Sequence, residues 1–175
     1  MTTSTTPSQC LRVGVGGPVG SGKTALLKAL AGCLPAGSLP DSAVTYGGLT
    51  AAELEAKGTS VNRLCAYVEQ VDTHLPFLTV RETAAFSHDN SCPPPPATPE
   101  GRALHADKLE AVTSLLALEG CIDTIIGDDL VRGVSGGEKK RVTVAEALVT
   151  NARALCMDEI STGLDAAVTF NIVAA

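Results

Sequence analysis

The sequence predicts an α/β fold, and three observations favour it. Apolar runs typical of short buried strands occur at residues 11–15, 64–68 and 154–157. Segments rich in helix-forming residues lie between these runs. A glycine-rich loop joins the first run to a helix predicted at residues 25–31. Because a chain of 175 residues buries about 70% of its unfolded surface on folding, we expect one domain over residues 1–175.

The glycine-rich loop carries the strongest functional pattern. The phosphate-loop pattern G-x-x-x-x-G-K-[ST], or Walker A, is met without mismatch by Gly17, Pro18, Val19, Gly20, Ser21, Gly22, Lys23 and Thr24. Its glycines allow successive N–H groups to point at a polyphosphate, and the helix start adds roughly half a positive charge. Lys23 is expected to contact the β- and γ-phosphates, and the Thr24 hydroxyl to bind Mg²⁺. A plain glycine turn with a solvated Lys23 explains the strand–loop–helix order less well.

Composition excludes several classes of protein. The formal net charge of −6 and the pI near 5.0 argue against a nucleic-acid partner. We interpret the basic residues 139–141 as a solvated helix face and expect Cys65 and Cys156 to be buried thiols. The six cysteines contain no C-x-x-C pair, which favours a reducing compartment over a zinc site or a disulfide scaffold. No apolar stretch is long enough to span a bilayer.

The first half of the chain contains further element signals. A turn-rich connection covers residues 35–41, and a short strand is predicted at 44–46. Thr50 begins a capping box that opens a short helix. The strand at 64–68 ends at Glu69 and Gln70, and a second capping box at Thr79 begins a helix through about Ser87.

The middle of the chain is predicted to be a loop followed by a long helix. Residues 89–100 include four consecutive prolines, and a surface loop explains them better than a polyproline ligand does. Residues 102–118 form an amphipathic helix that Gly120 ends, with one apolar face made by Leu104, Leu109, Val112, Leu115 and Leu116.

Two further clusters point to phosphate chemistry. Ser135, Gly136, Gly137 and Glu138 have capping-box spacing before a helix at 139–149. Two glycines suit a helix start poorly, at up to about 1 kcal/mol each, unless a phosphate approaches the backbone there, and both interpretations stay open on this motif alone. Asp158 and Glu159 end the strand at 154–157, as in a Walker B motif, although carboxylates at strand ends are also common on surfaces. Asp158 would then lie near Mg²⁺, and Glu159 would accept a proton from the attacking water.

The order of these motifs resembles an ATP-binding-cassette (ABC) ATPase over nearly the whole chain. By that resemblance Gln70 is the Q-loop glutamine, residues 134–138 are the signature, with Glu138 where many members have Gln, and Asp165 is the D-loop aspartate. The residue sequences of three segments resemble those of the G subfamily of eukaryotic ABC transporters and its pleiotropic-drug-resistance branch: 71–83, 132–143 and 158–165.

The resemblance implies a P-loop NTPase (RecA-like) core with an α-helical subdomain inserted at about 78–140. It implies ATP and Mg²⁺ as cofactors, with Thr24, Gln70 and Asp158 at the metal and Glu159 and Gln70 as catalytic residues. Two nucleotide-binding domains would close so that Lys23 of one and Ser135 of the other hold the same ATP. The implied activity is ATP hydrolysis that powers export of drugs, lipids or xenobiotics, at the cytoplasmic face of a membrane, through a transmembrane domain that this sequence lacks.

Three departures from the family pattern suggest a C-terminally truncated piece. The family's switch histidine lies beyond Ala175, while His74, His88 and His105 precede Asp158 and are interpreted as surface or loop residues. No aromatic residue precedes Lys23 to stack on adenine. The transmembrane domain and the last core strands are also missing.

Three alternatives to an exporter ATPase follow. One is a catalytically incomplete fragment that binds Mg·ATP without turnover, and another is a soluble ABC protein, which would need a second cassette or a coiled coil. Residues 12–26 also resemble the phosphate loop of the urease accessory GTPase, but the sequence has neither its Cys-x-His metal motif nor an Asn-Lys-x-Asp guanine motif.

Overall fold

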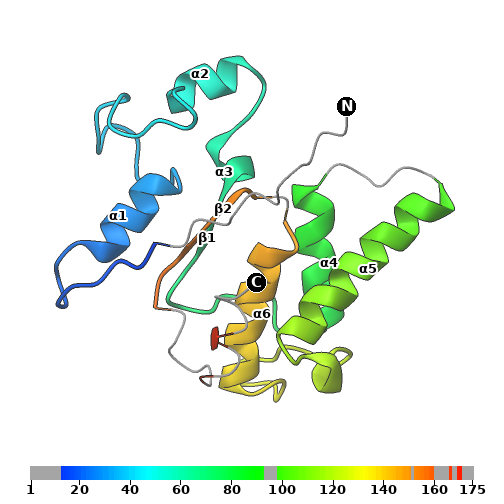
Figure 1. Cartoon of the computed structure of the whole chain (residues 1–175). Coiled ribbons are helices and arrows are strands. Elements are labelled where there is room, and N and C mark those ends of the chain that lie inside the picture. The colour runs from blue at the N-terminus through cyan, green and yellow to red at the C-terminus, as the bar shows by residue number, and fades with distance from the viewer. Residues whose placement is uncertain (1–12, 93–97, 151, 160–165, 167–168, 171–175) are drawn as a thin grey trace.

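The computed structural model describes residues 13–92, 98–150, 152–159, 166, 169 and 170. Within these residues, three helices precede the first of two short strands, and four helical elements lie between the two strands (Figure 1). The elements are α1 (Lys23–Leu30), α2 (Ala51–Ala56), α3 (Val61–Leu64), β1 (Cys65–Val68), α4 (Val80–Ser91), α5 (Pro99–Leu115), η1 (Glu119–Cys121), α6 (Gly136–Leu148) and β2 (Ala154–Met157). Both strands were predicted within one residue of their ends, and the α/β class is confirmed.

The two strands form a parallel pair at the centre of the described chain. Cys65 is paired with Ala154 and Val68 with Met157, so the carboxyl ends of both strands lie at the same edge. Helix α1 contacts both strands, and α6 contacts β1, with α4 and α5 beyond it (Figure 1). The sheet therefore separates the phosphate-loop helix from the larger group of helices.

The hydrophobic core lies on the α4, α5 and α6 side of this pair. Capping boxes at Thr50, Thr79 and Ser135 begin α2, α4 and α6, as predicted. The buried side chains of the core come from β1, α4, the end of α5, the segment 118–134 and α6: Val68, Val80, Ala84, Val112, Leu116, Leu118, Cys121, Ile126, Val134, Val142, Val144, Ala145, Ala147 and Val149. The predicted helical subdomain at 78–140 contains α4, α5 and η1, and its boundaries stay a prediction.

Two predicted strands are wrong. Residues 13–16 are exposed coil, with Val13 73% exposed, because neither β1 nor β2 pairs with them; Leu11 lies outside the described residues. Residues 44–46 make only an isolated bridge from Tyr46 to Leu49, since the chain reverses at two glycines between them.

Several helix ends also differ from the prediction. Helix α4 continues to Ser91, four residues past the predicted end. Helix α5 begins at Pro99 and ends at Leu115, where the hydrogen bonds Ala117 N to Ser114 O and Leu118 N to Thr113 O close the turn. Ala117 has a left-handed φ of 50°, so the helix stops before Gly120. The prolines at 93–96 lie outside the described residues.

The interpretation of three polar groups is corrected. The side chain of Lys140 is buried among backbone carbonyls rather than solvated. His74 lies in a loop, as expected, but only 3% of its side chain is exposed, and His88 is buried on α4; the side chain of His105 lies outside the description. Cys156 is buried as expected, but Cys65 is only partly so.

Candidate functional site

The phosphate loop is an exposed coil that leads directly into α1. Gly20 and Gly22 have φ values of +81° and +86°, a left-handed conformation that side chains other than glycine rarely adopt. Gly22 is the N-cap of α1 and has no side chain with which to accept a hydrogen bond from the first N–H groups of the helix. These amide groups and the positive end of the helix dipole suit a phosphate.

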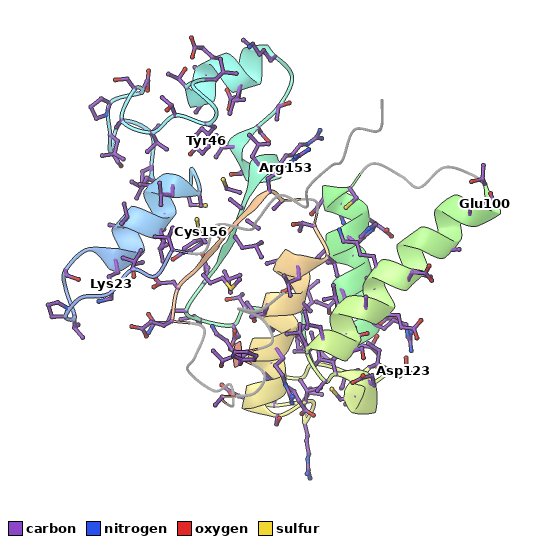
Figure 2. The ribbon with its side chains drawn as sticks, in the orientation of Figure 1. Lys23, Tyr46, Glu100, Asp123, Arg153 and Cys156 are labelled. Carbon is purple, nitrogen blue, oxygen red and sulfur yellow. The ribbon has the colours of Figure 1, made fainter. Side chains whose placement is uncertain are left out.

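Lys23 lies at the start of α1 and folds back over this loop (Figure 2). Its Nζ donates hydrogen bonds to the carbonyl oxygens of Gly17 at 2.7 Å and Pro18 at 2.8 Å, and lies 3.5 Å from the Ser21 Oγ. The ammonium group therefore lies across the loop that precedes α1. Thr24 is exposed on the first turn of the helix, where a metal could reach its hydroxyl.

The edge where both strands end brings three predicted residues together. The Asp158 amide donates to the Val68 carbonyl at 3.1 Å, which continues the parallel pairing past β2. Gln70 Nε2 then donates to Glu159 Oε2 at 2.6 Å. Asp158 is buried, with 4% of its surface exposed, while Glu159 is exposed and has a left-handed φ of 49°. An exposed carboxylate beside an amide donor and a buried carboxylate is suited to holding a metal and a water.

Tyr67 was not predicted to belong to this site. Its hydroxyl donates to Asp158 Oδ2 at 3.2 Å. Burial, followed by the charge of Asp158 and this hydrogen bond, raises the pKa of Tyr67 to about 12, so the hydroxyl keeps its proton at neutral pH. The Lys28 ammonium of α1 lies 5.7 Å from the centre of the Tyr67 ring. Tyr67 thus links the phosphate-loop helix to the edge where Asp158 lies. Its position on β1, near the end of the strand that precedes Gln70, was a signal that sequence reasoning missed.

The segment Ser135–Glu138 forms the start of α6. Glu138 Oε2 accepts hydrogen bonds from Ser135 N and Oγ, both at 2.7 Å, and Ser135 Oγ accepts one from Glu138 N at 3.3 Å. These bonds lower the pKa of Glu138, with the Ser135 hydroxyl as the largest cause. A Cβ on Gly136 would meet no atom of the described residues within 4 Å, so packing among those residues does not explain this glycine. Space over the helix start is what an approaching ligand needs.

The structure leaves part of the predicted site apart or undescribed. Among the described residues, no hydrogen bond or ion pair joins Ser135–Glu138 to the phosphate loop. Asp165, the predicted D-loop residue, lies outside the described residues. Within those residues no group of three or more His, Cys, Asp or Glu side chains is arranged to hold a metal. Oxygen ligands from Thr24 and Asp158 fit Mg²⁺, which usually takes one or two carboxylates and completes its shell with water and phosphate.

Comparison with known proteins decides the family. The family model described as ABC transporter matches residues 3–162. The chain belongs to the ABC transporter family. Within the described residues, no helix is long and apolar enough to cross a membrane.

The sequences of curated relatives indicate which branch of the family the chain resembles. The chain is 44% identical over 90% of its length to ABC transporter G family member 53 of Oryza sativa subsp. japonica. It is 40% identical to pleiotropic drug resistance protein TUR2 of Spirodela polyrhiza and 41% identical to pleiotropic drug resistance protein 1 of Petunia hybrida, again over 90% of the chain. In all three cases it spans only 12% of the relative's length.

Solved structures support the fold. The ATP-binding subunit of an ABC transporter matches 86% of this chain, and 55% of its own, with a TM-score of 0.64 at 18% identity. A bacterial Atm1-family ABC exporter with ATP bound matches 90% of this chain, and 25% of its own, with a TM-score of 0.62 at 23% identity. The predicted P-loop NTPase core is therefore confirmed at the level of the fold.

Proposed function

We propose that the chain binds Mg·ATP and belongs to the nucleotide-binding domain of an ABC exporter of the pleiotropic-drug-resistance type, where ATP hydrolysis powers transport. The observation that carries this proposal is the edge at which β1 and β2 end. There Gln70 contacts Glu159, Asp158 is buried, and Tyr67 connects the edge to the phosphate-loop helix.

Each residue of the site has a distinct role in this proposal. The amides of residues 17–24 and the Lys23 ammonium bind the phosphates, with Lys23 exchanging its two carbonyl acceptors for phosphate oxygens. Thr24, Gln70 and Asp158 hold Mg²⁺, which neutralises developing charge on the phosphate when bound. Glu159 takes a proton from the attacking water, and its bond from Gln70 Nε2 keeps the carboxylate oriented.

The proposal includes partners that act outside this chain. A second nucleotide-binding domain would supply its own Ser135–Glu138 segment to this ATP, consistent with the open helix start at Gly136. A transmembrane domain would receive the motion at the cytoplasmic face of a membrane, and Asp165 would face the second domain as the D-loop residue. Relatives named for drug resistance support export as the direction of transport.

Binding is tested with Lys23→Ala and isothermal titration of Mg·ATP. Charge-assisted hydrogen bonds are worth about 1.5–3 kcal/mol, so the dissociation constant should rise by about 10- to 100-fold. The matched control is Lys57→Ala, which removes the same charge from the end of α2 and should leave binding unchanged. Equal affinity of wild type and Lys23→Ala would refute the phosphate-loop assignment.

Turnover is tested with Glu159→Gln, which keeps the size of the side chain but removes its basicity. Phosphate release should fall by about 10²–10⁴-fold with Mg·ATP affinity retained. Binding without phosphate release in the wild type would instead favour the catalytically incomplete alternative. A preference for GTP over ATP would favour the accessory-GTPase alternative.

A further inference from the structure

Lys140 is a buried lysine whose whole hydrogen-bonding capacity is directed at one loop. Its side chain is 2% exposed, although it lies on α6 between two other charged residues. Nζ donates to the carbonyl oxygens of Glu69 at 2.8 Å and Gln70 at 3.0 Å, and lies 3.3 Å from Asp72 Oδ1. An ammonium group has three N–H donors, and here each has an acceptor.

Packing alone does not explain a lysine at this position. Burying an ammonium group costs several kcal/mol, and an apolar side chain of similar volume often replaces a buried ion without loss of stability. What an apolar side chain cannot do is to bind two consecutive backbone carbonyls. These carbonyls belong to the residues that immediately follow β1, and the second is that of Gln70 itself.

We infer that Lys140 is a positioning residue that fixes the backbone of residues 69–72 and so holds the Gln70 side chain against Glu159. This inference rests on the proposed function, in which Gln70 and Glu159 act at the nucleotide. Lys140 touches neither the nucleotide-binding loop nor Glu159 and acts through Gln70.

The next turn of α6 extends this attachment. Thr143 Oγ1 donates to Asp72 Oδ1 at 2.5 Å and lies 3.0 Å from His74 Nε2. His74 Nδ1 is in turn 3.2 Å from Glu146 Oε2. Residues 69–74 are therefore bound to α6 over nearly two turns, and α6 is the helix that Ser135 caps. One rigid helix thus connects the segment offered to a second domain's ATP with the loop that reaches this chain's own site.

The first test measures backbone motion in the 175-residue chain and needs no turnover. In Lys140→Met, ¹⁵N relaxation order parameters of residues 69–72 should fall from about 0.85 to below about 0.6, with those of β1 and of residues 141–148 unchanged. Lys139→Met is the matched control, because the Lys139 ammonium binds the carbonyl of Gly127 and not the loop. Unchanged order at 69–72 in Lys140→Met would overturn the inference.

A double variant, Asp72→Asn with Lys140→Met, keeps the test decisive if Lys140→Met alone fails to fold. This pair removes both charges, so no carboxylate is left without its cation, and the chain should keep its fold. The order parameters of residues 69–70 should still fall, since neither new side chain binds their carbonyls. Retained order in this folded double variant would also contradict the inference.

The second test measures catalysis by a double-mutant cycle. Lys140→Met should lower kcat for ATP by about 10- to 100-fold, as expected for a small misplacement of a catalytic group, with little change in KM. In a Gln70→Ala background the same substitution should have no further effect, because its action passes through Gln70. Additive losses would refute the positioning role. A wild type that binds no Mg·ATP would refute the proposed function, while the relaxation result would still decide whether Lys140 orders the loop.

Discussion

The phosphate-loop region and the helical side of the sheet differ in how they hold their shape. None of the eight residues of α1 is buried, and Leu26 remains 46% exposed. In α6, by contrast, five residues are buried, and every member of the hydrophobic core lies between residues 68 and 149. The region with the strongest sequence motif therefore has the least burial, because glycine conformations and helix-start amides are local features that need no core.

The difference predicts that stability and nucleotide binding can be separated by mutation. Variants on the helical side should unfold the chain, whereas variants in α1 and its loop should alter binding with little change in the free energy of unfolding. Each prediction compares one substitution or titration on the helical side with a matched control.

The largest effect is expected from Leu116→Ala. Leu116 is completely buried, and removing a buried leucine side chain costs about 2–5 kcal/mol. Leu26→Ala on α1 removes the same atoms from an exposed site and should change the free energy of unfolding by less than about 0.5 kcal/mol. Urea denaturation followed by circular dichroism measures both. Equal losses would show that α1 is packed as tightly as the core.

A smaller loss is expected from Gly133→Ala. A Cβ at this position would overlap the carbonyl groups of Ile126 and Ile125, which are backbone atoms and cannot rotate away. Overpacking of this kind costs about 1–3 kcal/mol. Gly136→Ala, three residues later, adds its methyl group to open space at a helix start and should be neutral or stabilising by up to about 1 kcal/mol. A destabilised Gly136→Ala with an unaffected Gly133→Ala would reverse the assignment of the two glycines.

The smallest effect is expected when the pH is lowered, at the hydrogen bond between Ser135 and Glu138. The folded state lowers the pKa of Glu138 from its ordinary 4.5, so its contribution to stability is complete above pH 4.5 and is lost as the pH falls through the lower folded value. The Ser135 amide, which donates to this carboxylate, should therefore lose protection against exchange, relative to its intrinsic rate at each pH, as the pH falls through this lower value.

Two comparisons isolate the carboxylate as the cause. Glu138→Gln keeps the capping geometry without a titrating group, so its Ser135 amide should lose this acid dependence. Helix α1 has no acidic residue in its first turn and no capping side chain, so its amides should show none either. Identical acid profiles for Ser135 in wild type and Glu138→Gln would contradict the assignment.

Sequence reasoning succeeded where the signal was local. Capping boxes at Thr50, Thr79 and Ser135 each begin a helix, because the side chain that caps lies within three residues of the amide it binds. The strand at Ala154–Met157 was found because an apolar run ended in two carboxylates.

Sequence reasoning failed where contacts with residues distant in the sequence determine the local structure. The run at 11–15 has the composition of a strand, but residues 13–16 pair with neither β1 nor β2. Lys140 was assigned to a solvated face because two charged residues flank it. Its spacing of four from Val144 and seven from Ala147, both buried, was the available signal that it lies on the inner side of α6. The acceptors it binds are about 70 residues away, and sequence spacing gives no access to such contacts.

The hydrogen bond between Gln70 and Glu159 spans 89 positions of the chain, which has a consequence for how the protein folds. The two strands that present these residues cannot pair during synthesis until the second has left the ribosome, whereas α4 and α6 contact each other between them. Closing so long a loop costs chain entropy before the strand pairing can compensate for it. We therefore expect the intervening helices to associate first. At a synthesis rate of about 5–20 residues per second, the second strand leaves the ribosome several seconds after the first. We therefore expect the site to assemble only after the helices between the two strands have formed.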